Sequence, residues 1–589
     1  MGFHYICDKI NIVVDIKTEI ASVIEQSLVN FTGAKINFLI EKPQNESFGD
    51  YSSNVVLLAS KIIKKNPFEL ANEIVKKLNN KLSDLPNIDK VKAMKPGFIN
   101  FYLSEEYLFS QLEKILEQKE KFGSKKEDPN KKVVVEYSSP NIAKPFTVGH
   151  LRSTIIGDAI ANLLVANGWK VYRDNHLGDW GTQFGKQIYA IKTWGNEGEI
   201  EKSENPVKNL VALYVKFHEE AEKNPELEEK AREWFKKLED GDSEARRLWK
   251  KCVDWSLKEF KIIYEKLGVK FTENEGLGYG EAFFEDKMAG VIRELKKKGL
   301  LKDGEEGAKL IFFANDPEKI SGQAKFPPLM ILKQDGATLY ATRDLATDEF
   351  RLEKYGKDTV IINEVGAEQS LYFNQLFESE KMLGWIKDGQ RIHIKHGLYR
   401  FKDQKMSTRK GNAIWLEDVL DEAIKRAENL GSDKKVAGDV GIGALKWNDL
   451  KRTPQQDIVF NWDEILNMQG DSGPYIQYSY VRTQSVLSKS KKEANSAKKD
   501  SIKLEPEEIS LLRALNNFPE VIQQAGEKFA PNALCNYLFD LAQKFNLFYQ
   551  KHKIIGSEQA EFRLALTRGV GQVLKNGLNL LGIKAPNKM

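Results

Sequence analysis

Two short segments of the chain carry residues suited to holding phosphate groups. The first is a turn that brings Gly149 and His150 to the predicted start of a helix. A helix start presents unpaired N–H groups and the positive end of the helix dipole, so anions bind there. Gly149 would let a charged ligand approach the backbone closely. His150 could donate a hydrogen bond to a phosphate oxygen that gains charge in a transition state.

The second segment is KMSTRKGN at residues 405–412. Lys405, Arg409 and Lys410 supply positive charge, and Gly411 gives the loop flexibility to clamp a polyphosphate. Taken alone, a run of this kind is more often a solvated basic loop, and an isolated Gly-His pair is more often a simple helix start. The two segments therefore need structural context before they indicate a nucleotide site.

The first segment lies inside a strand–helix–strand pattern. The apolar run in KKVVVEYSS (131–139) predicts a strand buried on both faces. Residues 150–168 place their apolar side chains on one helical face and end at Gly168, and 170–178 predicts the next strand. This pattern is a βαβ unit, and the parallel sheet that it implies binds ligands beyond the strand ends.

The length of 589 residues predicts several domains, because a single core rarely grows so large. Strands are expected at 35–43, 98–104, 308–313, 339–344 and 359–366, a helix at 52–65, a charged linker at 125–132, a helical insertion at 195–270 and a nearly all-helical region from about 470.

Composition narrows the class of protein. The 89 basic and 85 acidic residues leave a net charge of +4, which excludes a uniformly basic nucleic-acid coat but not a local basic surface. The three cysteines form no CxxC pair, which argues against a structural zinc site and a disulfide framework. No apolar run is long enough for a membrane span, and the first residues make a poor signal peptide. We therefore expect a cytoplasmic protein.

Several segments together resemble the arginyl-tRNA synthetases, which are class I aminoacyl-tRNA synthetases with signatures usually spelled HIGH and KMSK. These segments are SSPNIAKPFTVGHLRSTIIGD (138–158), NHLGDWGTQFG (175–185), LYATRD (339–344), KMSTRKGN (405–412) and LGIKAPNKM (581–589), and EKPQNESFGDYSSNVVLLASK (41–61) is similar to the appended N-terminal domain of the family. The resemblance covers essentially the full length of the chain.

The resemblance implies an α/β fold in three parts. Residues 1–120 would form an α+β domain that contacts the tRNA elbow, and 121–470 a Rossmann-like parallel-sheet catalytic domain with a helical insertion near 195–270. Residues 471–589 would form an all-α helical bundle that binds the anticodon. The implied reaction is ATP-dependent ligation of L-arginine to the 2′-hydroxyl of tRNA(Arg) through an arginyl-adenylate, with Mg²⁺ on the phosphates. Family members generally need tRNA even for the first step, and we expect a monomer.

The resemblance also implies which residues form each part of the site. Catalysis is expected from His150, Lys144 and Lys405. The expected ATP contacts are Thr147, Gly149, His150, His176, Gly178, Asp179, Met406, Ser407 and Arg409. The expected arginine contacts are Glu136, Ser139, Asn141, Glu281, Tyr340, Asp344 and Gln369, with Glu368 as an alternative to Gln369. The expected tRNA contacts are Tyr475, Tyr478, Arg482 and Met589, with Tyr480 as a further candidate for base stacking.

Two positions depart from the signatures of the family. Thr147 stands where HIGH has its first histidine, which removes an imidazole but keeps a hydroxyl. Thr408 stands where KMSK has its last lysine, which removes a cation. In this family a lysine just before the HIGH-like motif is thought to compensate, and Lys144 holds that place. We expect Lys144 to act with Lys405 on the triphosphate.

The charge of arginine gives a physical reason for the acidic residues. A guanidinium is planar, always protonated and rich in donors, so its selection calls for carboxylates in a fixed geometry. Asp344 is expected at the end of a strand, and strand periodicity puts Tyr340 on the same face. Glu281 matches a second acid of the family. Without the resemblance, each carboxylate would by default be a surface group.

Three other interpretations remain open from the sequence. A class I synthetase for another amino acid is one, although the absence of zinc-binding cysteines argues against cysteine and the paired acids argue against glutamate. A small-molecule nucleotidylyltransferase would share the HIGH-like turn but not the helical C-terminal third. A tRNA-binding relative without activity is the third, suggested by Thr147 and Thr408.

Overall fold

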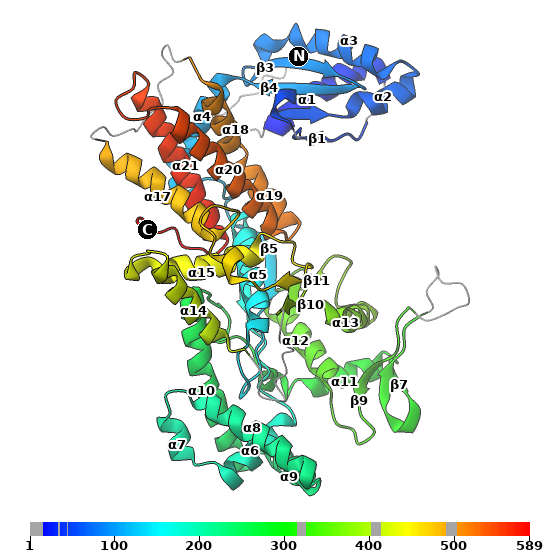
Figure 1. The fold of residues 1–589 in the computed structure, drawn as a ribbon. Coiled ribbons are helices and arrows are strands. Elements are labelled where there is room, and N and C mark those ends of the chain that lie inside the picture. Colours follow the sequence, from blue (N-terminus) through cyan, green and yellow to red (C-terminus); the bar gives the residue numbers. More distant parts are fainter. Residues whose placement is uncertain (1–15, 33–35, 44, 315–324, 402–413, 491–502) are drawn as a thin grey trace. The chain divides into compact units, whose positions relative to one another are not determined.

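The computed structural model of the chain describes residues 16–32, 36–43, 45–314, 325–401, 414–490 and 503–589. They fall into two compact units (Figure 1). Of the described residues, unit one contains those within 1–119, 486–517 and 547–572, and unit two contains those within 120–485, 518–546 and 573–589. Helices α17 (Gly473–Lys489), α20 (Pro531–Lys551) and α21 (Ala560–Leu580) contribute residues to both. No helix among the described residues is long and apolar enough to span a membrane.

Unit one is built around a four-stranded antiparallel sheet of order β1-β2-β4-β3. Its elements are α1 (Ile16–Thr32), β1 (Ile40–Glu41), η1 (Glu46–Phe48), β2 (Tyr51–Ser53), α2 (Val55–Ile63), α3 (Pro67–Asn79), η2 (Leu82–Asp84), β3 (Ile88–Met94), β4 (Phe98–Leu103), α4 (Glu105–Gln118) and α18 (Pro506–Asn516). The alternating pattern at 98–104 does form a strand. The strand expected at 35–43 is only two residues long, and the expected helix at 52–65 is confirmed as α2.

Unit two is organised by a four-stranded parallel sheet of order β11-β10-β5-β6. Its strands are β5 (Asp128–Glu136), β6 (Trp169–Asp174), β10 (Val360–Gly366) and β11 (Arg391–His396). Val133, Val134 and Val135 are at most 1% exposed, as expected for a strand covered on both faces. The expected charged linker at 125–132 is partly wrong, because β5 already begins at Asp128.

The predicted βαβ unit is confirmed: β5 leads through α5 (Val148–Ala166) into the adjacent parallel strand β6. Strand β10 pairs with the other edge of β5. The direction of winding therefore reverses between β5 and β10. Such a switch point leaves a crevice at the carboxyl ends of the strands, where open α/β sheets bind their ligands.

The insertion is helical, as expected, and a small antiparallel sheet of order β7-β8-β9 follows it. The elements are α6 (Gln183–Trp194), α7 (Glu197–Lys202), α8 (Pro206–Lys223), α9 (Glu226–Glu239), α10 (Ser243–Leu267), η4 (Asn274–Gly276), η5 (Glu281–Phe284), α11 (Met288–Lys297), β7 (Leu301–Asp303), β8 (Lys309–Ile311) and β9 (Leu329–Leu332).

The strand expected at 339–344 is wrong: Tyr340 begins helix α12 (Tyr340–Tyr355). In a wider window the buried apolar residues Ala341, Leu345 and Leu352 follow steps of four and seven, which is helical spacing. Six residues were too few to separate the two periods. The correction changes the element that presents Asp344.

The later part of unit two is mostly helical. It contains η7 (Ala367–Gln369), α13 (Ser370–Leu383), β12 (Tyr399–Arg400), α14 (Leu416–Asn429), α15 (Lys434–Leu450), β13 (Ile458–Val459), α16 (Trp462–Ile465) and α19 (Phe518–Glu527). Helix α20 has a buried apolar face, because Leu534, Leu538, Leu541 and Phe545 are all 0% exposed.

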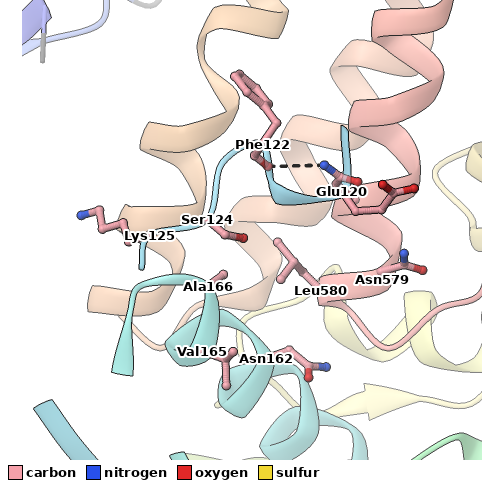
Figure 2. A pocket seen from close by; sticks show the side chains of 10 residues that line it. Glu120, Phe122, Ser124, Lys125, Asn162, Val165, Ala166, Asn579 and Leu580 are labelled. Atoms are coloured by element: carbon pink, nitrogen blue, oxygen red, sulfur yellow. Dashed lines mark hydrogen bonds between the residues drawn. The ribbon is translucent and has the colours of Figure 1, made fainter. Parts of the chain in front are cut away.

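A pocket of about 300 Å³ in unit two lies where the segment before β5 meets the ends of α5 and α21 (Figure 2). Its lining includes Asn162, Asn576 and Asn579, and Asn576 donates a hydrogen bond to the carbonyl of Phe122. None of the candidate binding and catalytic residues named from the sequence lines this pocket.

Candidate active site

A pocket of about 420 Å³ lies at the carboxyl ends of β5, β6 and β10. It gathers all seven residues expected for one ligand, Glu136, Ser139, Asn141, Glu281, Tyr340, Asp344 and Gln369, together with Glu368, His176 and Gly178. These residues come from strands, loops and helix starts as far as 233 positions apart in the chain, as the numbers of Glu136 and Gln369 show. The pocket therefore lies at the switch point between β5 and β10.

The loop after β5 has an unusual backbone. Ser138, Ser139 and Ala143 have φ values of 77°, 44° and 57°, in the left-handed region that non-glycine residues rarely adopt. Side chains hold this conformation: the Ser138 N–H donates to Ser153 Oγ at 2.9 Å, and the Ser139 N–H donates to Asn175 Oδ1 at 3.0 Å. Ser139 Oγ is buried and has no hydrogen-bond partner among the described residues, so a polar ligand in the pocket could satisfy it.

Asn141 and Gly178 lie against each other. The two form an isolated parallel bridge, and a Cβ on Gly178 would come within 2.4 Å of Asn141 Oδ1. The absence of a side chain at position 178 is therefore what lets Asn141 adopt its place in the pocket. Gly178, expected beside ATP, lies beside the residues expected for arginine.

Asp344 faces the pocket from the first turns of α12. Tyr340 lies four residues earlier, so helical rather than strand periodicity puts the two on one face. The Tyr372 hydroxyl of α13 donates to Asp344 Oδ2, and the rings of Tyr340 and Tyr372 meet edge to face at 4.9 Å. His176 Nε2 lies 3.6 Å from Asp344 Oδ1. Burial raises the pKa of Asp344, although His176 and the Tyr372 hydroxyl oppose that rise.

Glu281 is a second carboxylate at the pocket, at the start of η5. Arg343 Nη1 lies 3.2 Å from Glu281 Oε2. Burial raises the pKa of Glu281, and the cationic groups of Arg343 and His176 counteract part of that effect. Asp179 accepts the Ala282 N–H at 2.7 Å and so fixes η5. Asp179, expected beside ATP, thus supports the element that presents Glu281.

Arg351, which sequence reasoning missed, pairs with three acids at this end of the pocket. Its Nη2 lies 2.6 Å from Glu136 Oε2 and 2.7 Å from Asp174 Oδ2, and its Nη1 lies 3.2 Å from Asp348 Oδ1. Burial alone would raise the pKa of Glu136, but the Arg351 guanidinium lowers it overall. Glu136 is therefore an ionised, immobilised acceptor.

Tyr372 was also missed, although a signal for it existed. It lies in the segment that supplied Gln369, shortly after a parallel strand, where side chains face the switch point. Arg351 gave no comparable signal, because a helical arginine looks like a solvated surface residue. Between Glu368 and Gln369 the choice stays open, since both line the pocket.

The predicted phosphate-binding turn forms the start of α5. Thr147 is the N-cap residue, and its backbone N–H donates to His150 Nδ1 at 3.1 Å. Nδ1 is therefore an acceptor, and the ring hydrogen is on Nε2. Burial lowers the pKa of His150 to about 4, with Lys144 contributing in the same direction. His150 is thus neutral near pH 7, and its Nε2–H can donate to an anion.

The ligand contacts expected from the KMSTRKGN segment lie outside the described residues. They are Lys405, Met406, Ser407 and Arg409, and Thr408 lies outside as well.

The tyrosines of α17 differ in exposure. Tyr478 is 41% exposed, and the Arg482 guanidinium lies 4.9 Å from its ring centroid. The Tyr475 hydroxyl accepts from Asn546 Nδ2 at 2.9 Å. Tyr480 is only 4% exposed and donates to Asn587 Oδ1, so its expected role in base stacking is wrong. Met589 packs against the cluster of Ala427, Ala437 and Val440.

Three family models match the chain. They are described as tRNA synthetases class I (R), catalytic domain, over residues 111–462; DALR anticodon binding domain, over 476–589; and arginyl tRNA synthetase N terminal domain, over 15–103.

Similar proteins extend over nearly the whole chain. An arginine–tRNA ligase of Clostridium perfringens (strain 13 / Type A) is 41% identical over 570 residues, which are 94% of this chain and 96% of the relative. One of Halothermothrix orenii is 40% identical and covers 98% of this chain and 100% of its own. Among solved structures, Plasmodium falciparum arginyl-tRNA synthetase has a TM-score of 0.79 at 26% identity, covering 98% of this chain and 99% of that one.

Proposed function

Because this chain belongs to the arginyl-tRNA synthetase family, we propose that its pocket activates L-arginine with ATP through an arginyl-adenylate and that the arginyl group then passes to tRNA(Arg). Ligation of arginine to tRNA(Arg) is the activity of the family. The observation that carries the proposal is the juxtaposition of Asp344 and Glu281 in one pocket at the switch point. Two carboxylates beside a tyrosine hydroxyl form a recognition site for a guanidinium.

The pocket separates the two ends of arginine. Asp344, Glu281 and Tyr340 would hold the guanidinium. The ammonium and carboxylate would lie at the other side, near Asn141, Ser139 and Gln369, with Glu368 as the alternative to Gln369. Glu136, fixed by Arg351, supports that side. Fixing both ends leaves the carboxylate of arginine in place for attack on a bound nucleotide.

The first step needs no protein nucleophile. An oxygen of the arginine carboxylate attacks the α-phosphorus of MgATP, the bond to pyrophosphate breaks, and arginyl-adenylate forms. His150 would donate from Nε2 to the phosphate oxygens as they gain charge, and the start of α5 adds its dipole. The charge of Lys144 already acts on His150. Together with Lys405, Lys144 would place positive charge beside the triphosphate. In the second step the terminal 2′-hydroxyl of tRNA attacks the arginyl carbonyl and AMP leaves.

The C-terminal helices would bind the anticodon of tRNA(Arg). Exposed Tyr478 offers a stacking face, and Arg482 offers a cation beside it. Tyr475 and Met589 complete the proposed contacts, and the N-terminal α+β domain would contact the tRNA elbow. We further propose a cytoplasmic monomer whose arginine activation requires tRNA.

One assay tests the proposed function. Arginine-dependent ATP–pyrophosphate exchange, with and without tRNA(Arg), should occur with arginine and not with lysine, citrulline, cysteine or glutamate. Absence of exchange with arginine plus tRNA(Arg) would refute the proposal, and exchange with another amino acid would identify a different synthetase.

Gly149→Ala tests the nucleotide side. Among the described residues, a Cβ at position 149 would meet only Thr147 Oγ1, at 3.4 Å, which is an ordinary contact. The methyl group would instead occupy the surface that a phosphate approaches. We expect the KM for ATP to rise about tenfold or more, roughly 1.4 kcal/mol, without loss of thermal stability. Gly438→Ala on α15 is the matched control, since a Cβ there meets no atom of the described part of the chain within 4 Å. Equal kinetics of the two variants would contradict the assignment.

Tyr372→Phe tests the support of Asp344. The change removes one hydroxyl, which donates to Asp344 Oδ2, and keeps the ring that packs on Tyr340. We expect the KM for arginine to rise roughly tenfold, the effect of a hydrogen bond to a charged group, with a smaller change in kcat. Tyr189→Phe in the insertion, where the ring packs on Trp194 and Phe217, is the control. An unchanged KM would show that Asp344 needs no such support.

A further inference from the structure

His176 occupies the arginine pocket in an arrangement that the proposed reaction does not use. Its Nδ1 lies 2.9 Å from the carbonyl oxygen of Tyr279. A carbonyl only accepts, so Nδ1 carries a hydrogen in either charge state and Nε2 is the nitrogen that titrates. Nε2 is buried and has no hydrogen-bond partner among the described residues. It faces Asp344 Oδ1 at 3.6 Å.

The charged groups around His176 come from every element at this end of the pocket. Glu136 faces it from β5, Asp344 and Arg351 from α12, and Glu281 from η5. Asp179 also interacts with it. Arg351 is already paired with Glu136, Asp174 and Asp348, so the carboxylates dominate what the imidazole meets. Burial by itself would lower the pKa of His176, but Glu136 and Asp344 raise it overall above its ordinary value of 6.5.

We propose that His176 is an internal cation of the pocket, which loses its proton when the guanidinium of arginine binds beside Asp344. This inference rests on the proposed function. In the free enzyme no substrate cation faces the acids of the pocket, and protonated His176 balances part of their negative charge. The arriving guanidinium neutralises Asp344, adds its charge to that of Arg343 beside Glu281, and so brings a further positive charge close to Nε2. The N–H bond at Nε2 then breaks, its electron pair stays on nitrogen, and the proton passes to solvent.

The sign of the pH dependence follows from linkage. The pKa of His176 is higher in the free enzyme than in the arginine complex, so binding releases a proton between the two values. Above the higher value arginine binds without this cost. Below it, affinity for arginine falls by up to about tenfold per pH unit. Burial also raises the pKa of Asp344 and of Glu281 above their ordinary values of 3.8 and 4.5, so protonation of these acids would add losses of affinity at lower pH.

The same arrangement predicts how the pocket distinguishes arginine from a neutral analogue. Citrulline has the shape of arginine but no charge, so it cannot replace the cation at Nε2. Any citrulline that binds should leave His176 protonated. Arginine binding costs a proton while His176 is protonated, whereas citrulline binding does not, so selection for arginine over citrulline should increase as the pH rises through the pKa of His176.

Isothermal titration of the full-length enzyme with arginine, from pH 5.5 to 8.5 in buffers of different ionisation enthalpy, measures the protons released. We expect proton release to reach its maximum near neutral pH, at about half a proton if the pKa falls by one unit and closer to one proton if it falls further. The ratio of Kd at pH 6 to Kd at pH 8 should be well above one. His176→Asn keeps a donor near Nδ1 and removes Nε2. In this variant the release near neutral pH should disappear and the ratio should approach one.

A second measurement uses the wild-type enzyme and therefore does not require a variant that folds. The ring resonances of ¹³C-labelled histidine in the wild-type enzyme give the pKa of each imidazole with and without arginine, and only one of the seven histidines should shift downward by a unit or more. Arginine binding without proton release, or release that His176→Asn retains, would overturn the inference and leave the proposed function intact. No arginine binding at any pH, with or without tRNA(Arg), would contradict the proposed function instead.

Discussion

Asp344→Asn should raise the KM for arginine by roughly 10- to 150-fold, which corresponds to the 1.5–3 kcal/mol of a hydrogen bond to a charged group. The substitution keeps the shape of the side chain and leaves an oxygen for the Tyr372 hydroxyl. It removes the negative charge that faces the guanidinium and turns one acceptor into an amide donor, which repels the donors of arginine. Since Asp344 would bind the side chain of arginine far from the reacting carboxylate, kcat should change less than KM.

Steady-state kinetics of ATP–pyrophosphate exchange in the presence of tRNA(Arg) would measure this effect. Glu353→Gln is a suitable control, because it removes a carboxylate from an exposed position of the same helix. Citrulline provides a further comparison: the Asn variant should lose affinity for arginine but not for the neutral analogue. If the KM for arginine and the turnover both stay at wild-type values, Asp344 does not bind the guanidinium.

His150→Ala should reduce the kcat of arginine activation by about 10²–10³-fold, the effect of removing a donor that stabilises charge in a transition state. The KM for ATP should change little, because the donation strengthens as the phosphate oxygens gain charge. The effect should also be constant from about pH 5.5 upward. With a pKa lowered by burial to about 4, His150 is neutral throughout that range and its contribution cannot titrate there.

A matched substitution separates catalysis from folding. His150→Gln places an amide N–H near the position of Nε2 and should recover part of the rate, whereas both variants lose the acceptor for the Thr147 N–H and so share any loss of stability. Single-turnover formation of the adenylate would isolate the chemical step. Equal rates for the Ala variant and the wild type, or a decline shared equally by Ala and Gln, would show that His150 only starts the helix.

The sequence predicted the βαβ unit with small errors because its signals are local. The helix expected at 150–168 is α5 at Val148–Ala166, and the buried run of valines is the strand β5. At 339–344 the same reasoning chose the wrong element and still placed Tyr340 and Asp344 on one face. A step of four residues returns to the same side of a strand and nearly to the same side of a helix, so the spacing could not distinguish them.

The residues of the sequence alone determined the chemistry that this chain can carry: a helix start suited to phosphate, a basic loop, and acids suited to a guanidinium. Only the tertiary structure decided which acids face the pocket as partners for a ligand and which are neutralised within the protein. Glu136 and Arg351 lie 215 positions apart, and their contact at 2.6 Å cannot be read from spacing. The same holds for Tyr372 and His176 at Asp344. Whether a carboxylate binds substrate depends on burial and on the nearest opposite charge, and both arise from long-range packing rather than from the local chain.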